Sequence, residues 1–283
     1  MNQSAPAVPN GFNWTQAFGL RANPFRDALD PAFFFPTRQH EEALLKVRIG
    51  IEDGHALILL SGLSGTGKTM ISQMVLRDLG QGHETALVYV YPGMGKGPLL
   101  DAILSDLGEP SPGRFTQQRL AQLQEKALAL HEAGRRLVVI IDEAHFLKAD
   151  ALHLLRTLAN LETGREKLVT ILLIAEPGLR KRLAAPSYAA LRGRITFMID
   201  LAPMGQEESE QYIKYRLLKC SGSRELLSPA AYQAAHALSN GIPRELNRLL
   251  YNALLAALAA SESTLKPVLL AETATKMGLP WAK

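Results

Sequence analysis

The chain reads Gly62-Leu63-Ser64-Gly65-Thr66-Gly67-Lys68-Thr69 between an apolar run, Leu57 to Leu60, and a helical pattern from Met70 to Leu79. This stretch fits the pattern G-x-x-x-x-G-K-[ST] in a strand–loop–helix context. The glycines let the backbone turn tightly and point its N–H groups inward, and the start of the helix adds partial positive charge. We therefore predict a cradle for the phosphates of a nucleoside triphosphate.

The residues of this loop have separate expected roles. Lys68 is expected to reach the β- and γ-phosphates, and the hydroxyl of Thr69 to ligate Mg²⁺. Other contacts to the nucleotide are expected from the rest of the loop and the first helical turn, at Gly62, Ser64, Gly65, Thr66, Gly67 and Met70. A glycine turn that matches by chance is the alternative, and the flanking strand and helix argue against it.

A pair of acids follows a second buried strand. The run Leu137 to Ile141 is aliphatic without polar alternation, which predicts a parallel strand buried on both faces, and it ends in Asp142-Glu143. Carboxylates at this end of a strand lie where open parallel sheets bind ligands. Asp142 is expected to hold the water shell of Mg²⁺ and Glu143 to polarise an attacking water, so the pair predicts hydrolysis. An acidic turn after a core strand is the alternative.

Composition describes an ordinary globular chain of 283 residues with 47% apolar residues and a net charge of +4. No apolar run approaches the roughly 20 residues that span a bilayer, and the N-terminus lacks a signal pattern, so we expect a cytoplasmic protein with no membrane span. Cys220 is the only cysteine, which excludes an internal disulfide. The mild basic charge is compatible with nucleic acid or an anionic surface without requiring either.

Residues 1–16 are expected to form a flexible arm. From 17 to 202 short apolar runs alternate with helical patterns, which predicts an α/β domain, a parallel sheet with helices on both faces, with strands at Ala86–Tyr91, Leu137–Ile141, Leu168–Ile174 and Ile195–Leu201. Residues 203–283 are expected to form a smaller helical domain, with helices at Glu207–Lys219, Pro229–Ser239, Pro243–Ala260 and Pro267–Met277. Ser228-Pro229 is a typical helix start.

A phosphate-binding α/β domain followed by a small helical lid resembles the AAA+ ATPases. Gly241-Ile242-Pro243-Arg244 is similar to the family's sensor-2 motif. The resemblance implies that Arg244 reaches the γ-phosphate of bound ATP from the lid, so that lid closure depends on the nucleotide. A surface arginine at a helix start is the alternative reading.

The leader of the chain resembles the ExeA/GspA-type secretion ATPases and their pilus-biogenesis relatives. The similar stretches include Asn23-Pro24-Phe25, Phe33 to Thr37 and His40-Glu41-Glu42-Ala43-Leu44, and the resemblance extends over residues 17–260. It implies that Asn23 and Phe25 lie against the adenine of ATP. The alternative is that these aromatic residues pack the arm onto the core.

Two departures from the family pattern stand out. Ala175-Glu176-Pro177 puts an acid where the family usually offers a neutral residue to position the lytic water, so Glu176 is expected to alter that step. The ExeA/GspA proteins also continue into a transmembrane helix and a peptidoglycan-binding domain, whereas this sequence ends at Lys283. A role in a cell-envelope machine is then expected to require a membrane partner.

The stretch from Arg180 to Arg194 holds five basic residues and no acid. Arg192 and Arg194 precede the strand at Ile195, where AAA+ proteins commonly place an arginine finger. The resemblance implies that one of them completes a neighbouring subunit's site, and hence a ring or helical homo-oligomer. A solvated basic face is the alternative.

Three functional classes remain open from the sequence. The first is an assembly or remodelling ATPase of secretion or pilus machinery. The second is an ATP-dependent DNA-binding oligomer similar to the MuB/TnsC/TniB transposition regulators, with a transposase as partner and with DNA contacts through the loops that carry Lys96 and Lys148. The third is a nucleotide-gated switch without significant turnover, which Glu176 keeps open.

Overall fold

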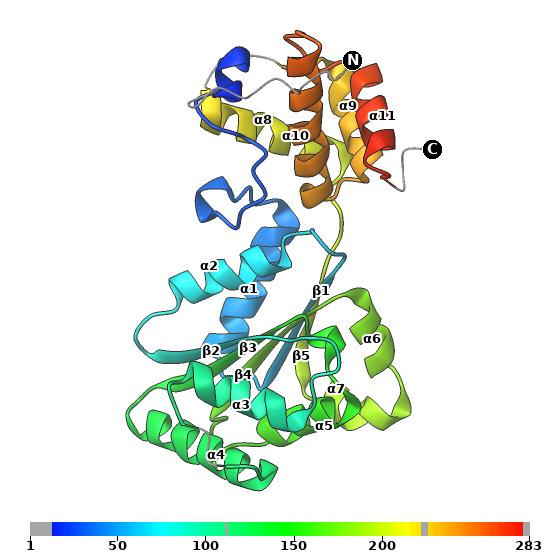
Figure 1. Cartoon of the computed structure of the whole chain (residues 1–283). Coiled ribbons are helices and arrows are strands. Elements are labelled where there is room, and N and C mark those ends of the chain that lie inside the picture. The colour runs from blue at the N-terminus through cyan, green and yellow to red at the C-terminus, as the bar shows by residue number, and fades with distance from the viewer. Residues whose placement is uncertain (1–12, 111–112, 222–225, 280–283) are drawn as a thin grey trace, which may run out of the picture. The chain divides into compact units, whose positions relative to one another are not determined.

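The computed structural model describes residues 13–110, 113–221 and 226–279, which form two compact units (Figure 1). The first unit comprises residues 36–202. The second combines the described residues up to Phe35 with those from Pro203 onward. Most of the predicted flexible arm lies outside the described residues, and its last part belongs to a 3-10 helix, η1 (Trp14–Phe18).

The first unit contains a five-stranded parallel sheet in the order β2-β3-β4-β1-β5. The strands are β1 (Leu57–Gly62), β2 (His83–Tyr89), β3 (Arg136–Asp142), β4 (Val169–Ala175) and β5 (Ile195–Leu201). Every residue of β1 and β4 is buried, as their largely apolar sequences predict. The predicted α/β fold is therefore confirmed.

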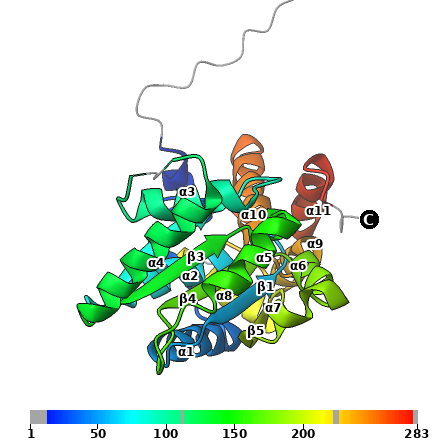
Figure 2. The same cartoon turned by 90° about the horizontal axis from the view of Figure 1, so that it is seen from below.

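Helices cover both faces of the sheet (Figures 1 and 2). One face packs against α1 (Arg38–Glu52) and α2 (Lys68–Asp78). Gly50 of α1 lies so close to the sheet that an added Cβ would stand 2.5 Å from Cδ1 of Ile58. On the other face Leu57 and Leu59 share one core with side chains of α3 (Lys96–Asp106), α4 (Thr116–Glu132), α5 (Ala149–Leu158), α6 (Pro177–Leu183) and α7 (Ala189–Arg192).

The residues of the predicted site follow the carboxyl ends of the strands. Because all five strands are parallel, the segments that follow β1, β3 and β4 leave the sheet at the same edge. Strand β4 lies between β1 and β3, with Ala175 in register with Ser61. Glu176 therefore follows the strand that separates the phosphate loop from Asp142.

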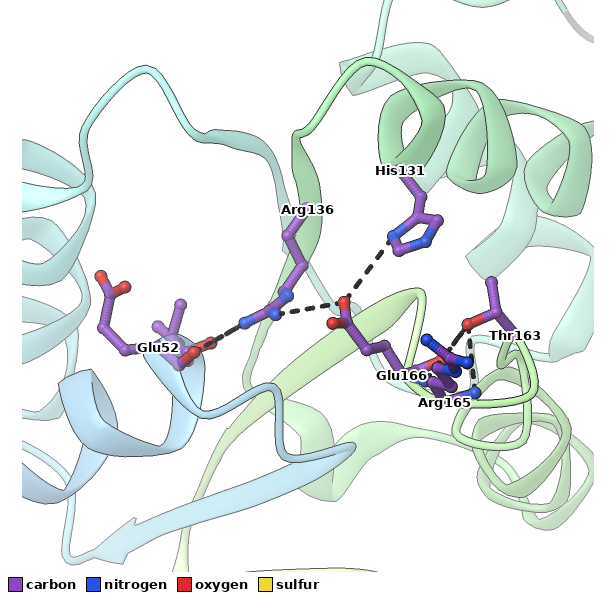
Figure 3. A network of polar contacts seen from close by, with 7 residues as sticks. Glu52, His131, Arg136, Thr163, Arg165 and Glu166 are labelled. Carbon is purple, nitrogen blue, oxygen red and sulfur yellow. Dashed lines mark hydrogen bonds and ion pairs between the residues drawn. The ribbon is translucent and has the colours of Figure 1, made fainter.

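Arg136, the first residue of β3, connects several elements at the amino end of the sheet (Figure 3). Its Nη1 donates to the carbonyl oxygens of Ile51 and Glu52 at 2.9 and 2.8 Å, which caps the end of α1. Its Nη2 lies 3.9 Å from Oε2 of Glu166, and Nδ1 of His131 lies 4.0 Å from the same oxygen. This network joins α1, α4, β3 and the 162–167 turn, and we assign it a structural role.

The second unit is built on the four predicted helices, which are confirmed as α8 (Gln206–Ser221), α9 (Pro229–Ser239), α10 (Pro243–Ala259) and α11 (Pro267–Lys276). The expected start of α9 is present, since Oγ of Ser228 accepts from the N–H of Ala231 at 3.3 Å and Pro229 occupies the first turn. Leu246, Leu249 and Leu250 of α10 lie in the centre of its core.

The segment before Pro36 packs on these helices. Phe18, Leu20 and Phe25 belong to the helical core. Arg216 of α8 is buried and donates to the carbonyl oxygens of Pro24 and Arg26 at 2.5 and 3.0 Å. Residues 17–35 were expected in the α/β domain, and these buried contacts place them in the helical unit instead.

Arg216 is supported by a buried polar chain inside this unit. Its Nη1 donates to the hydroxyl of Tyr212 at 3.0 Å, which donates to Oδ1 of Asn247 at 2.9 Å. Burial raises the pKa of Tyr212, which keeps the hydroxyl a donor. These hydrogen bonds link α8, α10 and the leader segment (the described residues before Pro36), and they satisfy the polar groups that are buried there.

Across the described parts of both units, no helix is long and apolar enough to cross a membrane.

Candidate nucleotide-binding site

The phosphate loop connects the end of β1 to the start of α2, as predicted. Gly62 approaches β5 so closely that an added Cβ would lie 2.7 Å from the carbonyl oxygen of Leu201. Gly67 caps α2 with φ of 99°, a left-handed conformation that side chains disfavour. Both positions therefore require glycine. The loop leads directly into the N-terminus of α2, and the N–H groups of a helix start suit an anion.

Lys68 is buried, with 6% of its surface exposed. Its Nζ donates to the carbonyl oxygens of Gly62 and Leu63, both at 2.9 Å. The ammonium is thus held against the loop, and a positive charge at this place suits a bound phosphate. Thr66 is buried beside it, Ser64 is exposed, and Gly65 and Met70 are half-buried.

Thr69 and Asp142 meet across the site. Oγ1 of Thr69 donates to Oδ2 of Asp142 at 2.9 Å, and Oδ1 of Asp142 accepts from the N–H of Glu143 at 2.8 Å. Asp142 is 2% exposed. A hydroxyl and a carboxylate are the oxygen donors that Mg²⁺ prefers, and they join the loop to β3 as the motif requires. These residues fit the expected ATP and Mg²⁺.

Glu143 follows in a left-handed conformation, φ 59° and ψ 33°, and its side chain is 43% exposed. Its Oε2 lies 3.4 Å from Nδ1 of His145. The same nitrogen lies 3.3 Å from the backbone nitrogen of Glu176, which caps α6. His145 therefore contacts the carboxylate of Glu143 and accepts from the backbone N–H of Glu176. His145 was not predicted from the sequence, although the run Asp142-Glu143-Ala144-His145 places it two residues after the catalytic candidate.

Both candidates for a trans-acting arginine are hydrogen-bonded within their own unit. Nη1 of Arg192 donates to the carbonyl oxygens of Leu183 and Ala184 at 3.0 and 2.9 Å, which caps the end of α6. Arg194 donates to Oδ1 of Asn160 at 2.7 Å and to the carbonyl oxygen of Ala190 at 2.6 Å. Either arginine would have to leave these partners to enter a neighbour's site.

Three predicted nucleotide contacts lie in the helical unit. Phe25 is 2% exposed in its core, so its ring is not open to a base, and Oδ1 of Asn23 accepts from the N–H of Phe25 at 2.9 Å. Phe25 instead packs its segment onto the helical core, which was the alternative to a contact with adenine. Arg244 is exposed in the first turn of α10, where the sensor-2 resemblance puts it.

Comparisons with known proteins agree with this geometry. Residues 51–183 match the family described as AAA domain. The fold is similar to the Aeropyrum pernix ORC2 protein in its ADPNP-ADP complexes, with a TM-score of 0.64 and 18% identity over 91% of this chain and 73% of that one. It is also similar to Drosophila ORC bound to DNA, with a TM-score of 0.70 and 16% identity over 98% and 69%.

The chain belongs to the AAA+ class of P-loop ATPases. Within that class it is related to General secretion pathway protein A of Aeromonas hydrophila, the ExeA/GspA type, with 36% identity over 248 residues. These residues are 87% of this chain and 45% of the relative, so the chain spans less than half of that protein's length.

Proposed function

We propose that this chain binds ATP with Mg²⁺ and hydrolyses it as an oligomeric assembly or remodelling ATPase of secretion or pilus machinery. The hydrogen bond of 2.9 Å between Thr69 and Asp142 carries the proposal, because it joins the phosphate loop to the strand that presents Glu143. The relationship to General secretion pathway protein A supports the cellular role. Its need for ATP favours the cytoplasmic side of the envelope.

The residues divide the work in this proposal. Lys68 and the loop bind the phosphates, and Thr69 and Asp142 hold Mg²⁺, which supplies charge stabilisation when bound. Glu143 takes a proton from the attacking water, and Glu176, which follows the neighbouring strand β4, influences where that water sits. Arg244 contacts the γ-phosphate, and Arg192 or Arg194 acts on a neighbouring subunit's site.

Mixed oligomers test the trans arginine. When Arg194→Ala protein is mixed with an equal amount of Lys68→Ala protein, we expect hydrolysis to recover to about a quarter of the wild-type rate, since random mixing joins an intact loop to an intact arginine at roughly one interface in four. Each variant alone should be nearly inactive. Steady-state phosphate release measures the recovery, and the same mixture is made with Arg192→Ala.

Lys181→Ala serves as the matched control. Lys181 lies in the same basic segment and is exposed, and its side chain shows no hydrogen bond or ion pair among the residues that the structure describes. We expect its activity to equal that of the wild type. An absence of recovery with both arginine variants, under conditions where sedimentation shows mixed oligomers, would contradict a trans arginine.

A specific surface supports a second candidate, the ATP-dependent DNA-binding oligomer of the transposition type. The loops after β2 and β3 are tied together, since the N–H of Gly93 donates to the carbonyl oxygen of Phe146 at 3.2 Å and the N–H of Lys148 donates to that of Met94 at 2.9 Å. Tyr91 and Phe146 are 53% and 39% exposed there. Lys148 is exposed on one of these loops, and Lys96 is exposed at the first residue of α3, where the other loop ends. Aromatic rings beside lysines suit stacked bases and phosphates.

For this candidate we expect Tyr91→Ala to weaken binding of a labelled single-stranded oligonucleotide by about 1–3 kcal/mol, the value of one stacked base. Fluorescence anisotropy with a slowly hydrolysed ATP analogue measures it. Phe115→Ala is the control, because Phe115 is 70% exposed outside the two loops. Equal binding by both variants, or none by the wild type, would remove the candidate.

A further inference from the structure

A buried pair from α1 lies against the phosphate loop. Thr37 precedes the first turn of α1, and both Thr37 and His40 are 4% exposed. Oγ1 of Thr37 lies 2.6 Å from Nδ1 of His40, and Nε2 of His40 lies 3.0 Å from the carbonyl oxygen of Thr66. Helices α1 and α2 contact each other, as Figure 1 shows. The ring of His40 thus contacts the backbone of the phosphate loop.

The hydrogen-bond chemistry of these three groups allows one arrangement of protons on a neutral ring. A carbonyl oxygen only accepts, so Nε2 of His40 must carry a proton and donate it to Thr66. Nδ1 then has a lone pair and accepts from the hydroxyl of Thr37. Thr37 therefore fixes the tautomer that lets His40 hold the loop.

This bond orients a particular peptide group. The carbonyl of Thr66 and the N–H of Gly67 belong to one planar trans peptide, so they point in opposite directions. Holding the carbonyl toward His40 directs the N–H of Gly67 away from His40. Gly67 has φ of 99°, and glycine accepts several backbone conformations at little cost, so the bond from His40 adds a constraint at a peptide next to a permissive residue.

We infer that His40 is a positioning residue that locks the Thr66–Gly67 peptide with its N–H turned toward bound phosphate, and that Thr37 holds His40 in the required tautomer. The inference rests on the proposed nucleotide binding. Its effect is preorganisation: the donor is aimed before the nucleotide arrives, which stabilises the complex with ADP as well as with ATP. An added Cβ at Gly67 would lie 3.0 Å from Nε2, so the close contact also explains why glycine stands there.

Titration with N-methylanthraniloyl-ADP and Mg²⁺ tests the inference. We expect His40→Leu to weaken binding about tenfold, the loss of one hydrogen bond that orients a donor. His40→Gln should recover most of the affinity, because its side-chain amide donates from nearly the position of Nε2. Thr37→Val should weaken binding and Thr37→Ser should not, since only valine lacks the hydroxyl.

The amide signal of Gly67 in a ¹H–¹⁵N spectrum is a second measurement. If His40 only filled space in the core, its replacement would leave the response of this signal to ADP unchanged. We expect its shift on ADP addition in the wild type and in His40→Gln, and a reduced shift in Thr37→Val. Thermal melting without nucleotide checks that each variant is folded. If His40→Leu fails to fold, the comparison of Thr37→Val with Thr37→Ser tests the inference in its place.

The failures are distinguishable. A folded wild type that binds no nucleotide overturns the proposed function. A wild type that binds, with equal affinity and equal Gly67 shifts in folded His40→Leu and Thr37→Val, overturns the role of His40 and leaves nucleotide binding intact.

Discussion

Lys68→Ala is expected to reduce ATP hydrolysis by about 10²–10³-fold or more, because it removes a buried positive charge at the phosphate loop. The ammonium is already held against the loop by the carbonyl oxygens of Gly62 and Leu63, so little reorganisation precedes phosphate binding. Binding of ATP should fall together with turnover. Phosphate release and a nucleotide titration measure the two effects separately.

Two controls make this result specific. Lys46→Ala removes an exposed lysine of α1 and should leave hydrolysis unchanged. Because Lys68 also bonds two loop carbonyls, its removal should lower the free energy of unfolding by about 1–2 kcal/mol, so melting without nucleotide confirms that the variant is folded. A folded Lys68→Ala protein with wild-type turnover would disprove the assignment of the loop.

The sheet was predictable because its strands carry a strong local signal. The run Leu137–Ile141 is apolar at every position, and only a strand buried on both faces needs that pattern. The predicted strand Ile195–Leu201 has the observed bounds, and the phosphate loop lies between β1 and α2. Given a parallel sheet, the position of Asp142 near Thr69 follows from topology.

The location of the leader segment was not predictable from local pattern. Apolar residues such as Phe18 and Phe25 indicate burial, but nothing in their spacing says which of two cores they enter. The answer depends on Arg216, nearly two hundred residues along the chain, whose guanidinium bonds the carbonyls of Pro24 and Arg26. Long-range backbone contacts of this kind leave no periodic trace in the sequence.

The histidines were missed for a related reason. His40 and His145 act through a carbonyl oxygen, a backbone N–H and a nearby carboxylate, which are not visible as ligand spacing. Similarly, Arg192 and Arg194 stood out by their charge and by their position before a strand, while their hydrogen bonds to α6 and α7 depend on the folded turns around them. Sequence motifs indicate which residues belong to the candidate site. The contacts that support these residues are visible only in the folded structure.

Glu143→Gln is expected to keep ATP binding and to slow hydrolysis by about 10²–10⁴-fold, because the amide preserves the shape of the side chain and removes the base. The side chain of Glu143 is 43% exposed and takes no part in the bond between Thr69 and Asp142, so the binding groups remain in place. An ATP-bound oligomer should accumulate. Single-turnover hydrolysis, nucleotide titration and sedimentation measure the three effects.

The variant Asp142→Asn separates the role of Asp142 from that of Glu143. Asp142 is 2% exposed and accepts from both Thr69 and Glu143, so its amide variant should lose affinity for ATP with Mg²⁺ as well as turnover. Glu143→Gln should lose turnover alone. If Glu143→Gln hydrolyses ATP like the wild type while Glu176→Gln does not, the base is Glu176, which directly follows the neighbouring strand β4. If neither variant slows hydrolysis, general-base catalysis by these acids is excluded.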